Sequence, residues 1–376
     1  MNQHKPDNRE VAGPRLLSLD FFRGATMFLL VAEGTGLWNV LVKEPVAGTF
    51  LESIFIQFHH HPWDGLRFWD LVQPFFMFIV GVAMPFSYLK RLNSGETKGN
   101  ITLHILKRCL LLMAFGVGLH CVYRRQLVWE LWNVLTQLSV TILIAYFLMR
   151  YKPSVQIIAS LVLLLITEMA YRFFPLEGFD QPFTKDQNFG TWMDLVLMGK
   201  INQGGGWVAI NFIPTAAHTI WGVVAGQLLL SGKTGSDKIK KLVIYGFIIL
   251  IAGYVLHYSS VTPIIKRIST SAFVLASGGW SLLVLAFSYW FIDIKKINQW
   301  IFPFVIVGMN PIFIYLFSQT VGAQWLNGFT AIFTKGVLSW FSVSEFCMAL
   351  LTSLTILLLE WLLCLYLFRK RIFFKI

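Results

Sequence analysis

The stretch HHHPWDGLRFWDLVQPFFMFIVGVAMPFSYLKRL, residues 59–92, decides the architecture of this chain. It opens with three consecutive histidines and a Pro-Trp-Asp-Gly turn, continues into an apolar run, and ends on Lys90 and Arg91. An apolar run of about 20 residues is long enough to cross a bilayer as a helix. We expect Asp70 two turns inside that helix, where an ionisable group is costly and therefore indicates function. Titratable imidazoles thus stand at the mouth of a membrane helix.

The composition of the whole chain agrees with this reading. The 376 residues are 56% hydrophobic and only 13% charged, whereas soluble domains carry about 25% charged residues. The sequence therefore predicts a polytopic membrane protein. The net charge of +12 is explained by Lys and Arg in cytoplasmic loops, so we expect no nucleic-acid partner.

Ten apolar runs have the length of a transmembrane helix. They are residues 20–42, 68–89, 102–122, 129–149, 154–173, 207–230, 242–260, 271–292, 299–320 and 346–368. No stretch outside them is long enough to fold as a separate soluble domain. We therefore predict an all-α membrane bundle of about ten helices, forming one domain over residues 1–376.

The basic residues predict the orientation of this bundle. With the amino terminus inside, one side receives most of the Lys and Arg of the loops, including the tail Arg369-Lys370-Arg371. This bias predicts that both termini are cytoplasmic, with residues 1–18 as a cytoplasmic segment. The stretches 173–206 and 321–345 become extracytoplasmic loops, and the histidine triplet faces outward. In a bacterium the membrane would be the inner, cytoplasmic membrane.

The histidines themselves allow two kinds of chemistry. An imidazole titrates near neutral pH and can accept a proton from an attacking amine or hydroxyl. Asp70 or Asp64 could then fix its tautomer. A metal site built from His59, His60 and His61 would need converging rings and usually has wider spacing, so we favour a general base and expect no metal.

Further polar residues interrupt the apolar runs and predict a polar cavity inside the bundle. They are Glu33, Gln73, Gln137, Asn211, His218 and Asn310. His218 could equally be a packing residue bonded to a neighbouring helix. Gly222 and Gly226 lie four residues apart, a spacing that allows helices to approach closely. Arg23 either pairs with Asp20 three residues earlier or faces an anionic group arriving from the cytoplasm.

Several motifs together resemble the heparan-α-glucosaminide N-acetyltransferase family of membrane acyltransferases, in its bacterial branch, some members of which are described as N-acetylglucosamine-related transporters. The most specific piece is HHPWDGLRFWDLVQPFFMFIVGVAM, residues 60–84. The supporting pieces, in the order of the family, are LDFFRG (19–24), NVLTQLSVTILIAY (133–146), FIPTAAHTIWGVVAG (212–226) and VGMNPIFIYLF (307–317).

The resemblance implies roles for individual residues. The catalytic histidine of the family stands three residues before the Trp of an H-x-x-W-x-G turn, which selects His60 here. The family's acidic, amide and G-x-N positions correspond to Asp70, Gln137, Gly308 and Asn310. Two positions depart from the family: Glu33 stands where members commonly have Asn, and Leu138 replaces an Arg.

The resemblance also implies an activity, the transfer of acetyl from cytoplasmic acetyl-CoA to an amino sugar or glycan across the membrane, with His60 either as general base or as a transient carrier of the acetyl group. Arg23, Lys90 or Arg91 would bind the phosphates of acetyl-CoA. Gln137, Asn310, Glu33 and His218 are candidates for oxyanion stabilisation or substrate positioning. A sugar transporter with Trp63, Trp69 and Trp280 stacking on sugar rings is the alternative, followed by a membrane scaffold without catalysis. A homodimer is compatible with such a bundle.

Overall fold

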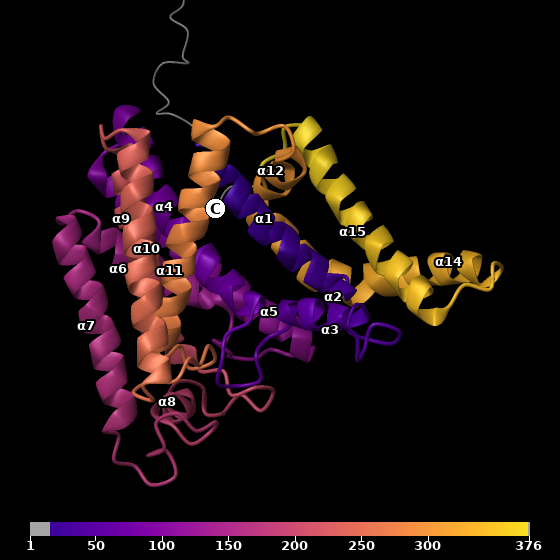
Figure 1. The fold of residues 1–376 in the computed structure, drawn as a ribbon, viewed down its shortest axis with the longest axis horizontal. Coiled ribbons are helices and arrows are strands. Elements are labelled where there is room, and N and C mark those ends of the chain that lie inside the picture. Colours follow the sequence, from indigo (N-terminus) through magenta and orange to yellow (C-terminus); the bar gives the residue numbers. More distant parts are fainter. Residues whose placement is uncertain (1–15, 375–376) are drawn as a thin grey trace, which may run out of the picture.

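A computed structural model describes residues 16–374, and its elements are helices (Figure 1). No strand forms in that range, where one isolated bridge joins Asp64 to Ile265. The elements are α1 (Leu17–Gly34), α2 (Leu37–Val40), α3 (Phe50–Phe55), η1 (Ile56–Phe58), η2 (Phe68–Leu71), α4 (Val72–Asn93), α5 (Lys98–Arg124), α6 (Val134–Leu148), α7 (Pro153–Arg172), α8 (Phe189–Met198), η3 (Ala209–Asn211), α9 (Phe212–Leu230), α10 (Gly235–Tyr258), α11 (Ser271–Ser288), η4 (Tyr289–Ile294), α12 (Phe302–Gly308), α13 (Pro311–Phe317), η5 (Ser318–Leu326), α14 (Asn327–Ser339) and α15 (Glu345–Arg369).

Seven helices of the described chain are long and apolar enough to cross a membrane. They are η2 with α4, α5, α7, η3 with α9, α10, α11 with η4, and α15. An eighth span is obtained if α12 and the helix that follows it from Pro311 are taken together, although the two are bent by 81°. The predicted helical membrane bundle is therefore present, with seven or eight such spans where the sequence suggested ten.

The difference in number has local causes. α1 has 18 residues and carries Asp20, Arg23 and Glu33, and at 1.5 Å per residue it is about 27 Å long. α6 has 15 residues and is about 22 Å long, whereas the apolar core of a bilayer is about 30 Å thick. The break after α12 falls at Met309 and Asn310, directly before Pro311, which cannot donate a helical hydrogen bond.

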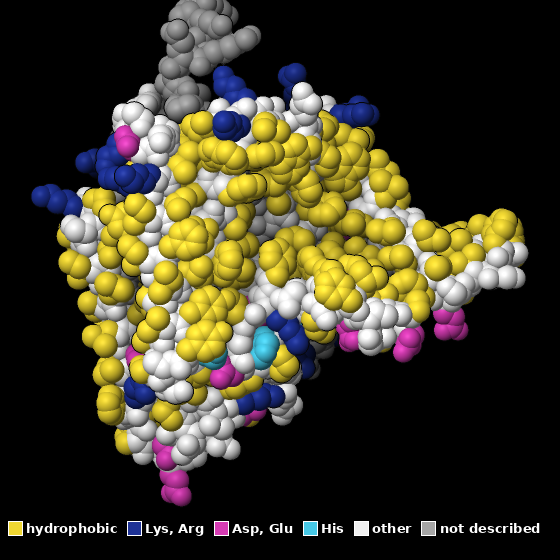
Figure 2. Space-filling view, in the orientation of Figure 1, with side chains coloured by type: hydrophobic (Ala, Val, Ile, Leu, Met, Phe, Trp, Pro, Cys, Tyr) yellow, Lys and Arg dark blue, Asp and Glu magenta, His cyan; other side chains and the backbone are white. Residues whose placement is uncertain are grey.

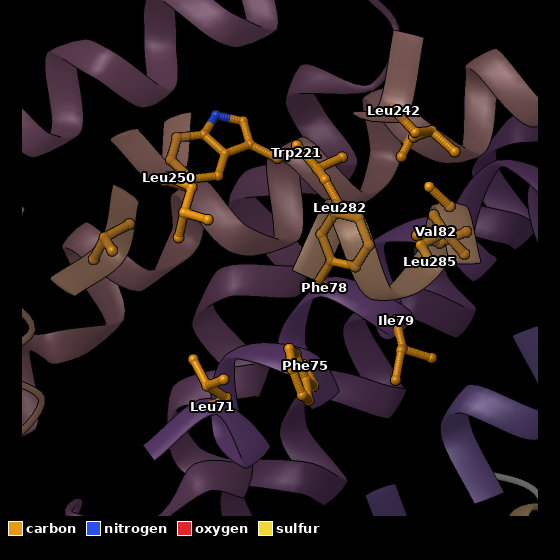
Figure 3. Close-up of a cluster of buried hydrophobic side chains, with 14 of the residues drawn as sticks. Leu71, Phe75, Phe78, Ile79, Val82, Trp221, Leu242, Leu250, Leu282 and Leu285 are labelled. Carbon is orange, nitrogen blue, oxygen red and sulfur yellow. The ribbon is translucent and has the colours of Figure 1, made fainter. Parts of the chain in front are cut away.

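α4 is the central helix of the bundle, and it packs chiefly against α9. Phe75, Phe78 and Val82 of α4 are buried in the same cluster as Trp221 of α9 and Leu285 of α11 (Figure 3). This position explains why residues 72–85 read as a nearly continuous apolar sequence: a helix surrounded by other helices is apolar on all sides.

Small residues allow the close contact of α4 and α9. A Cβ added to Gly222 would lie 2.2 Å from the carbonyl oxygen of Phe78, and one added to Gly81 would lie 2.1 Å from that of Thr219. A Cβ at Gly226 would similarly meet the carbonyl oxygen of Val82 at 2.4 Å. The predicted small-residue contact surface at Gly222 and Gly226 is thus confirmed, and α4 is fixed where it carries the histidine loop.

The two stretches that we expected as outer loops contain helices. Residues 173–206 include α8, and residues 321–345 include the end of η5 and all of α14. α14 packs on α15, and the two form the arm at the right of Figure 1. On the other side of the view, α10 and α11 run beside each other.

Candidate active site

The histidine loop, residues 59–67, is held in shape by its own turn and by a distant segment. Gly65 has φ +146°, and a Cβ there would lie 2.6 Å from Nε2 of His61, so glycine is required. The Gly65 N–H donates to the carbonyl of Ile264 at 2.8 Å. The Arg67 guanidinium donates to the carbonyl of His60 at 3.0 Å. The Pro-Trp-Asp-Gly turn thus closes the loop over the start of η2.

His60 and Asp70 form a hydrogen-bonded pair, as the sequence suggested. The Nδ1 atom of His60 lies 2.9 Å from Oδ1 of Asp70. Asp70 is only 1% exposed, and its Oδ2 accepts from the backbone N–H groups of His61 at 3.1 Å and Arg67 at 2.9 Å. Because a buried carboxylate only accepts hydrogen bonds, the ring proton of His60 stays on Nδ1, which donates to Asp70, and the lone pair is on Nε2.

The depth that we expected for Asp70 was wrong. The residue lies in η2, one turn from the start of the helix, where its carboxylate closes a capping box with the backbone of Arg67. The length of the apolar run does not show where the helix begins, and the helix begins at Phe68, so that Asp70 lies in its first turn and caps it. The carboxylate consequently points back at the histidine loop.

Lys266, from the segment between α10 and α11, is the third member of this group. Its Nζ lies 3.8 Å from Oδ1 of Asp70 and 3.2 Å from Nδ1 of His60. A single ring nitrogen cannot donate to one neighbour and accept from another. Since Nδ1 donates to Asp70, it cannot also accept from Lys266, and the ammonium of Lys266 acts as the counter-ion of the Asp70 carboxylate.

The electrostatics of the site favour a neutral imidazole. Burial, followed by the positive charge of Lys266, lowers the pKa of His60 to about 4, although Asp70 opposes this shift. Burial also lowers the pKa of Lys266 to about 8, against the attraction of Asp70 and Glu33. At pH 7 the site therefore holds a neutral His60, an anionic Asp70 and a predominantly cationic Lys266, and His60 can act as a base.

His60 faces a cavity, which we call the His60 cavity. No described residue bonds to its Nε2, and 33% of its side chain is exposed, so a substrate can reach the ring. The other side chains with polar atoms that line the cavity are Glu33, Trp69, Gln73, Trp132, Gln137, Trp207, Lys266 and Tyr315. Gln73 donates to Gln137, and Trp69 Nε1 donates to Glu33 at 3.1 Å. Gln137 and Glu33 thus lie with His60 as expected.

A second cavity adjoins the first, and we call it the arginine cavity. Three helices supply a guanidinium each: Arg23 from α1, Arg91 from α4 and Arg108 from α5. Phe76, Pro311 and Ile312 line both cavities. The two cavities therefore share part of one wall.

The arginines differ in their partners. Arg91 binds Glu96 at 2.9 Å and His104 at 2.8 Å, and Arg23 lies 3.8 Å from Asp20. The Nε atom of Arg108 is buried and has no hydrogen-bond partner within residues 16–374. An unpaired buried guanidinium donor is costly, which makes Arg108 suited to an anionic ligand.

Three predicted residues lie elsewhere. Lys90 is exposed and does not line either cavity. The amide of Asn310 is occupied by the C-terminal segment, since it donates to the carbonyl of Ile372 at 2.9 Å and accepts from Phe374 N–H at 2.8 Å. His218 bonds through Nε2 to Ser277 of α11 at 2.8 Å. The packing alternative thus describes His218.

The three histidines of the triplet do not converge. His59 Nε2 lies 3.1 Å from the carbonyl of Trp38, His60 binds Asp70, and the ring of His61 lies against Gly65. Within the described part of the chain, no group of three or more His, Cys, Asp or Glu side chains has the geometry of a metal site.

Sequence reasoning missed Lys266, Trp207 and Arg108 as site residues. Lys266 and Arg108 are ordinary basic residues in the linear pattern, and Trp207 follows a glycine triplet. Lys266 lies 206 residues from His60, so no periodicity connects the two. One signal in the sequence could have pointed to this segment. Lys266 and Arg267 are two adjacent basic residues on the predicted outer side, where basic residues are few.

Comparison with protein families now assigns the chain. Residues 15–202, half of its length, match the family described as "Domain of unknown function (DUF5009)". The chain belongs to the DUF5009 family. The family region contains the histidine loop, Asp70, Glu33 and Gln137, while Lys266 and Trp207 lie beyond it.

Two curated relatives confirm the resemblance drawn from the motifs. The chain is 30% identical over 114 residues to heparan-α-glucosaminide N-acetyltransferase of Mus musculus, and 32% identical over 104 residues to that of Homo sapiens. These alignments cover 30% and 28% of this chain, but only 15% and 13% of the relatives. This DUF5009 member is thus distantly homologous to a membrane N-acetyltransferase.

Proposed function

We propose that the protein is a membrane acetyltransferase that moves acetyl from cytoplasmic acetyl-CoA to an amino sugar or other glycan on the opposite side. The observation that carries the proposal is that the cavity of His60, which is hydrogen-bonded to Asp70, shares a wall with a cavity lined by three arginines. Arginine is suited to phosphate recognition, and a neutral imidazole with a free Nε2 is suited to remove a proton from an acceptor. The homology to N-acetyltransferases supports the same reaction.

The orientation that this requires follows from charge. Figure 2 shows Lys and Arg side chains along the upper end of the molecule, with a few more in its lower half, where most of the acidic side chains lie. By the preference of basic residues for the cytoplasm, the upper end would be cytoplasmic, with both termini there and the His60 cavity towards the outside. In a bacterial cell this membrane would be the inner membrane.

The proposed reaction is a direct transfer. The acceptor amine attacks the thioester carbonyl, forming a C–N bond, and the C–S bond breaks. Nε2 of His60 takes the proton of the amine and delivers it to the departing thiolate, which leaves as CoA thiol. Gln137, which lines the cavity, is positioned to donate to the developing oxyanion. Such donors contribute about 3–4 kcal/mol each.

The test is transfer of labelled acetyl in proteoliposomes. With acetyl-CoA supplied on the side of the arginine cavity, we expect labelled N-acetylglucosamine from glucosamine on the other side. The transporter alternative predicts uptake of labelled sugar without acetyl-CoA. It placed Trp63, Trp69 and Trp280 around one sugar site; of these, only Trp69 lines the His60 cavity, where Trp132 and Trp207 stand in place of the other two. Uptake without acetyl-CoA, together with absent transfer, would favour the transporter.

Arg108→Ala is expected to weaken acetyl-CoA binding about tenfold to a hundredfold, as for loss of one charge-assisted hydrogen bond. The measurements are KM for acetyl-CoA and Kd for CoA. Lys90→Ala is the matched control, since Lys90 is also basic but lines neither cavity. Equal effects of the two substitutions would contradict a phosphate site at the arginine cavity.

A further inference from the structure

Lys266 is a buried cation whose environment is built by three separate segments. Its exposure is 6%, and its Nζ is 3.8 Å from Asp70 and 3.2 Å from His60. A cation is seldom buried unless it is paired. Lys266 also lies outside the family region that contains its two partners.

The backbone around Lys266 is fixed to the histidine loop. Ile264 accepts from Gly65 N–H at 2.8 Å, and Ile265 forms the isolated bridge with Asp64. Just beyond Lys266, the carbonyl of Arg267 accepts from Val208 N–H at 3.3 Å. These backbone hydrogen bonds therefore fix Lys266 next to His60 and next to the segment that carries Trp207.

Trp207 completes the arrangement. Its ring lies edge-on to His60, with 5.3 Å between ring centroids. The Nζ of Lys266 lies 5.4 Å from the centre of the same ring, and the guanidinium of Arg267 lies 5.5 Å from it. A cation within about 6 Å of an indole face is attracted to it, so Trp207 holds the ammonium in place without neutralising it.

We infer that Lys266 is a positioning residue for His60: its ammonium, held by Asp70 and Trp207, opposes protonation of the imidazole while Asp70 keeps the proton on Nδ1. The inference rests on the proposed function, in which His60 is the base. It adds a requirement that the family region alone does not meet, because the charge comes from the segment between α10 and α11.

The charges that face His60 decide what removal of Lys266 would do. The groups concerned are Asp70 and Glu33, which are acidic, and Lys266, Arg67 and Arg267, which are basic. Asp70 touches the ring directly, while Arg267 acts from farther away through Trp207. Without the ammonium, burial and the more distant Arg267 would still oppose imidazolium, but one of the groups that lower the pKa of His60 would be gone. The pKa of His60 would then rise from about 4 towards the range that is usual for histidine.

The test measures the protonation of His60 in the full-length protein without relying on catalysis. Diethyl pyrocarbonate modifies neutral imidazole, and tandem mass spectrometry distinguishes His60 from its neighbours. In the wild type, where the pKa of His60 is about 4, we expect the modification rate to change little between pH 8 and 5.5. In Lys266→Met we expect the rate at pH 5.5 to be at most about half of the rate at pH 8, because loss of the ammonium raises the pKa of His60 towards its ordinary value.

Two variants act as controls. Lys266→Arg keeps the charge and should follow the wild type, as should Lys200→Met, which removes a lysine that pairs with Glu130 instead. The inference fails if Lys266→Met follows the wild type, or if Lys266→Arg shifts as far as Lys266→Met. If Lys266→Met does not fold, Lys266→Gln takes its place under the same criteria, and a wild-type midpoint near the ordinary value would overturn the inference in either case.

The pH at which the rate of acetyl transfer falls on the acid side should shift in the same direction as the modification curve. Loss of rate at low pH would occur at higher pH in Lys266→Met than in the wild type or Lys266→Arg. Absence of transfer in the wild type would contradict the proposed function, while the modification curves would still decide the role of Lys266.

Discussion

His60→Ala is expected to lower the rate of acetyl transfer by about 10²–10⁴-fold, the usual contribution of a positioned general base. The expectation follows from the geometry: Nδ1 is bound to Asp70 at 2.9 Å, and Nε2 is left for a substrate in the His60 cavity. The measurement is the initial rate of labelled acetyl transfer in proteoliposomes. Binding of acetyl-CoA should be retained, because the arginine cavity does not include His60.

The neighbouring histidines provide matched controls. In His59→Ala the lost contact is with the carbonyl of Trp38, and in His61→Ala the backbone N–H that donates to Asp70 remains. Both variants should retain far more activity than His60→Ala. If all three fell equally, the loop would be needed only for folding, and a full rate in His60→Ala would exclude the imidazole as base.

The sequence predicted the spans that consist of one uninterrupted apolar helix. Residues 68–89, 271–292 and 346–368 correspond closely to η2 with α4, α11 with η4, and α15. The prediction failed where an apolar run is long enough to span the membrane but does not form one continuous helix. The run 299–320 contains the break at Met309 and Asn310, and the run 129–149 begins with an extended segment before α6. Such breaks depend on caps and on tertiary contacts, which a window average does not register.

The same distinction applies to the candidate site. His60 and Asp70 are ten residues apart, so a turn and a helix start are sufficient to bring them together. Polarity inside an apolar run, in contrast, did not distinguish catalysis from packing. Glu33 and Gln137 line the His60 cavity, whereas His218 binds Ser277 and Asn310 binds the C-terminal segment. Burial creates a demand for a partner, and the sequence does not say which partner meets it.

Asp70→Asn is expected to be nearly as damaging as loss of the imidazole, with a fall of about 10²–10⁴-fold in transfer rate. The orientation of the new amide follows from its fixed neighbours. The backbone N–H groups of His61 and Arg67 both donate to Oδ2, so the amide oxygen must take that position and the NH₂ group must face His60. The NH₂ group then donates to Nδ1, which moves the ring proton to Nε2.

With the proton on Nε2, His60 cannot remove a proton from the attacking amine. The variant thus keeps the imidazole, but in the tautomer that cannot act as the base. The measurement is the transfer rate together with KM for acetyl-CoA, which should change little because the arginines are untouched. Asp194→Asn is the matched control: that carboxylate is equally buried, at 1% exposure, but it binds Trp132 and the backbone of Ala209. A transfer rate in Asp70→Asn equal to that of Asp194→Asn would show that the tautomer of His60 does not limit the reaction.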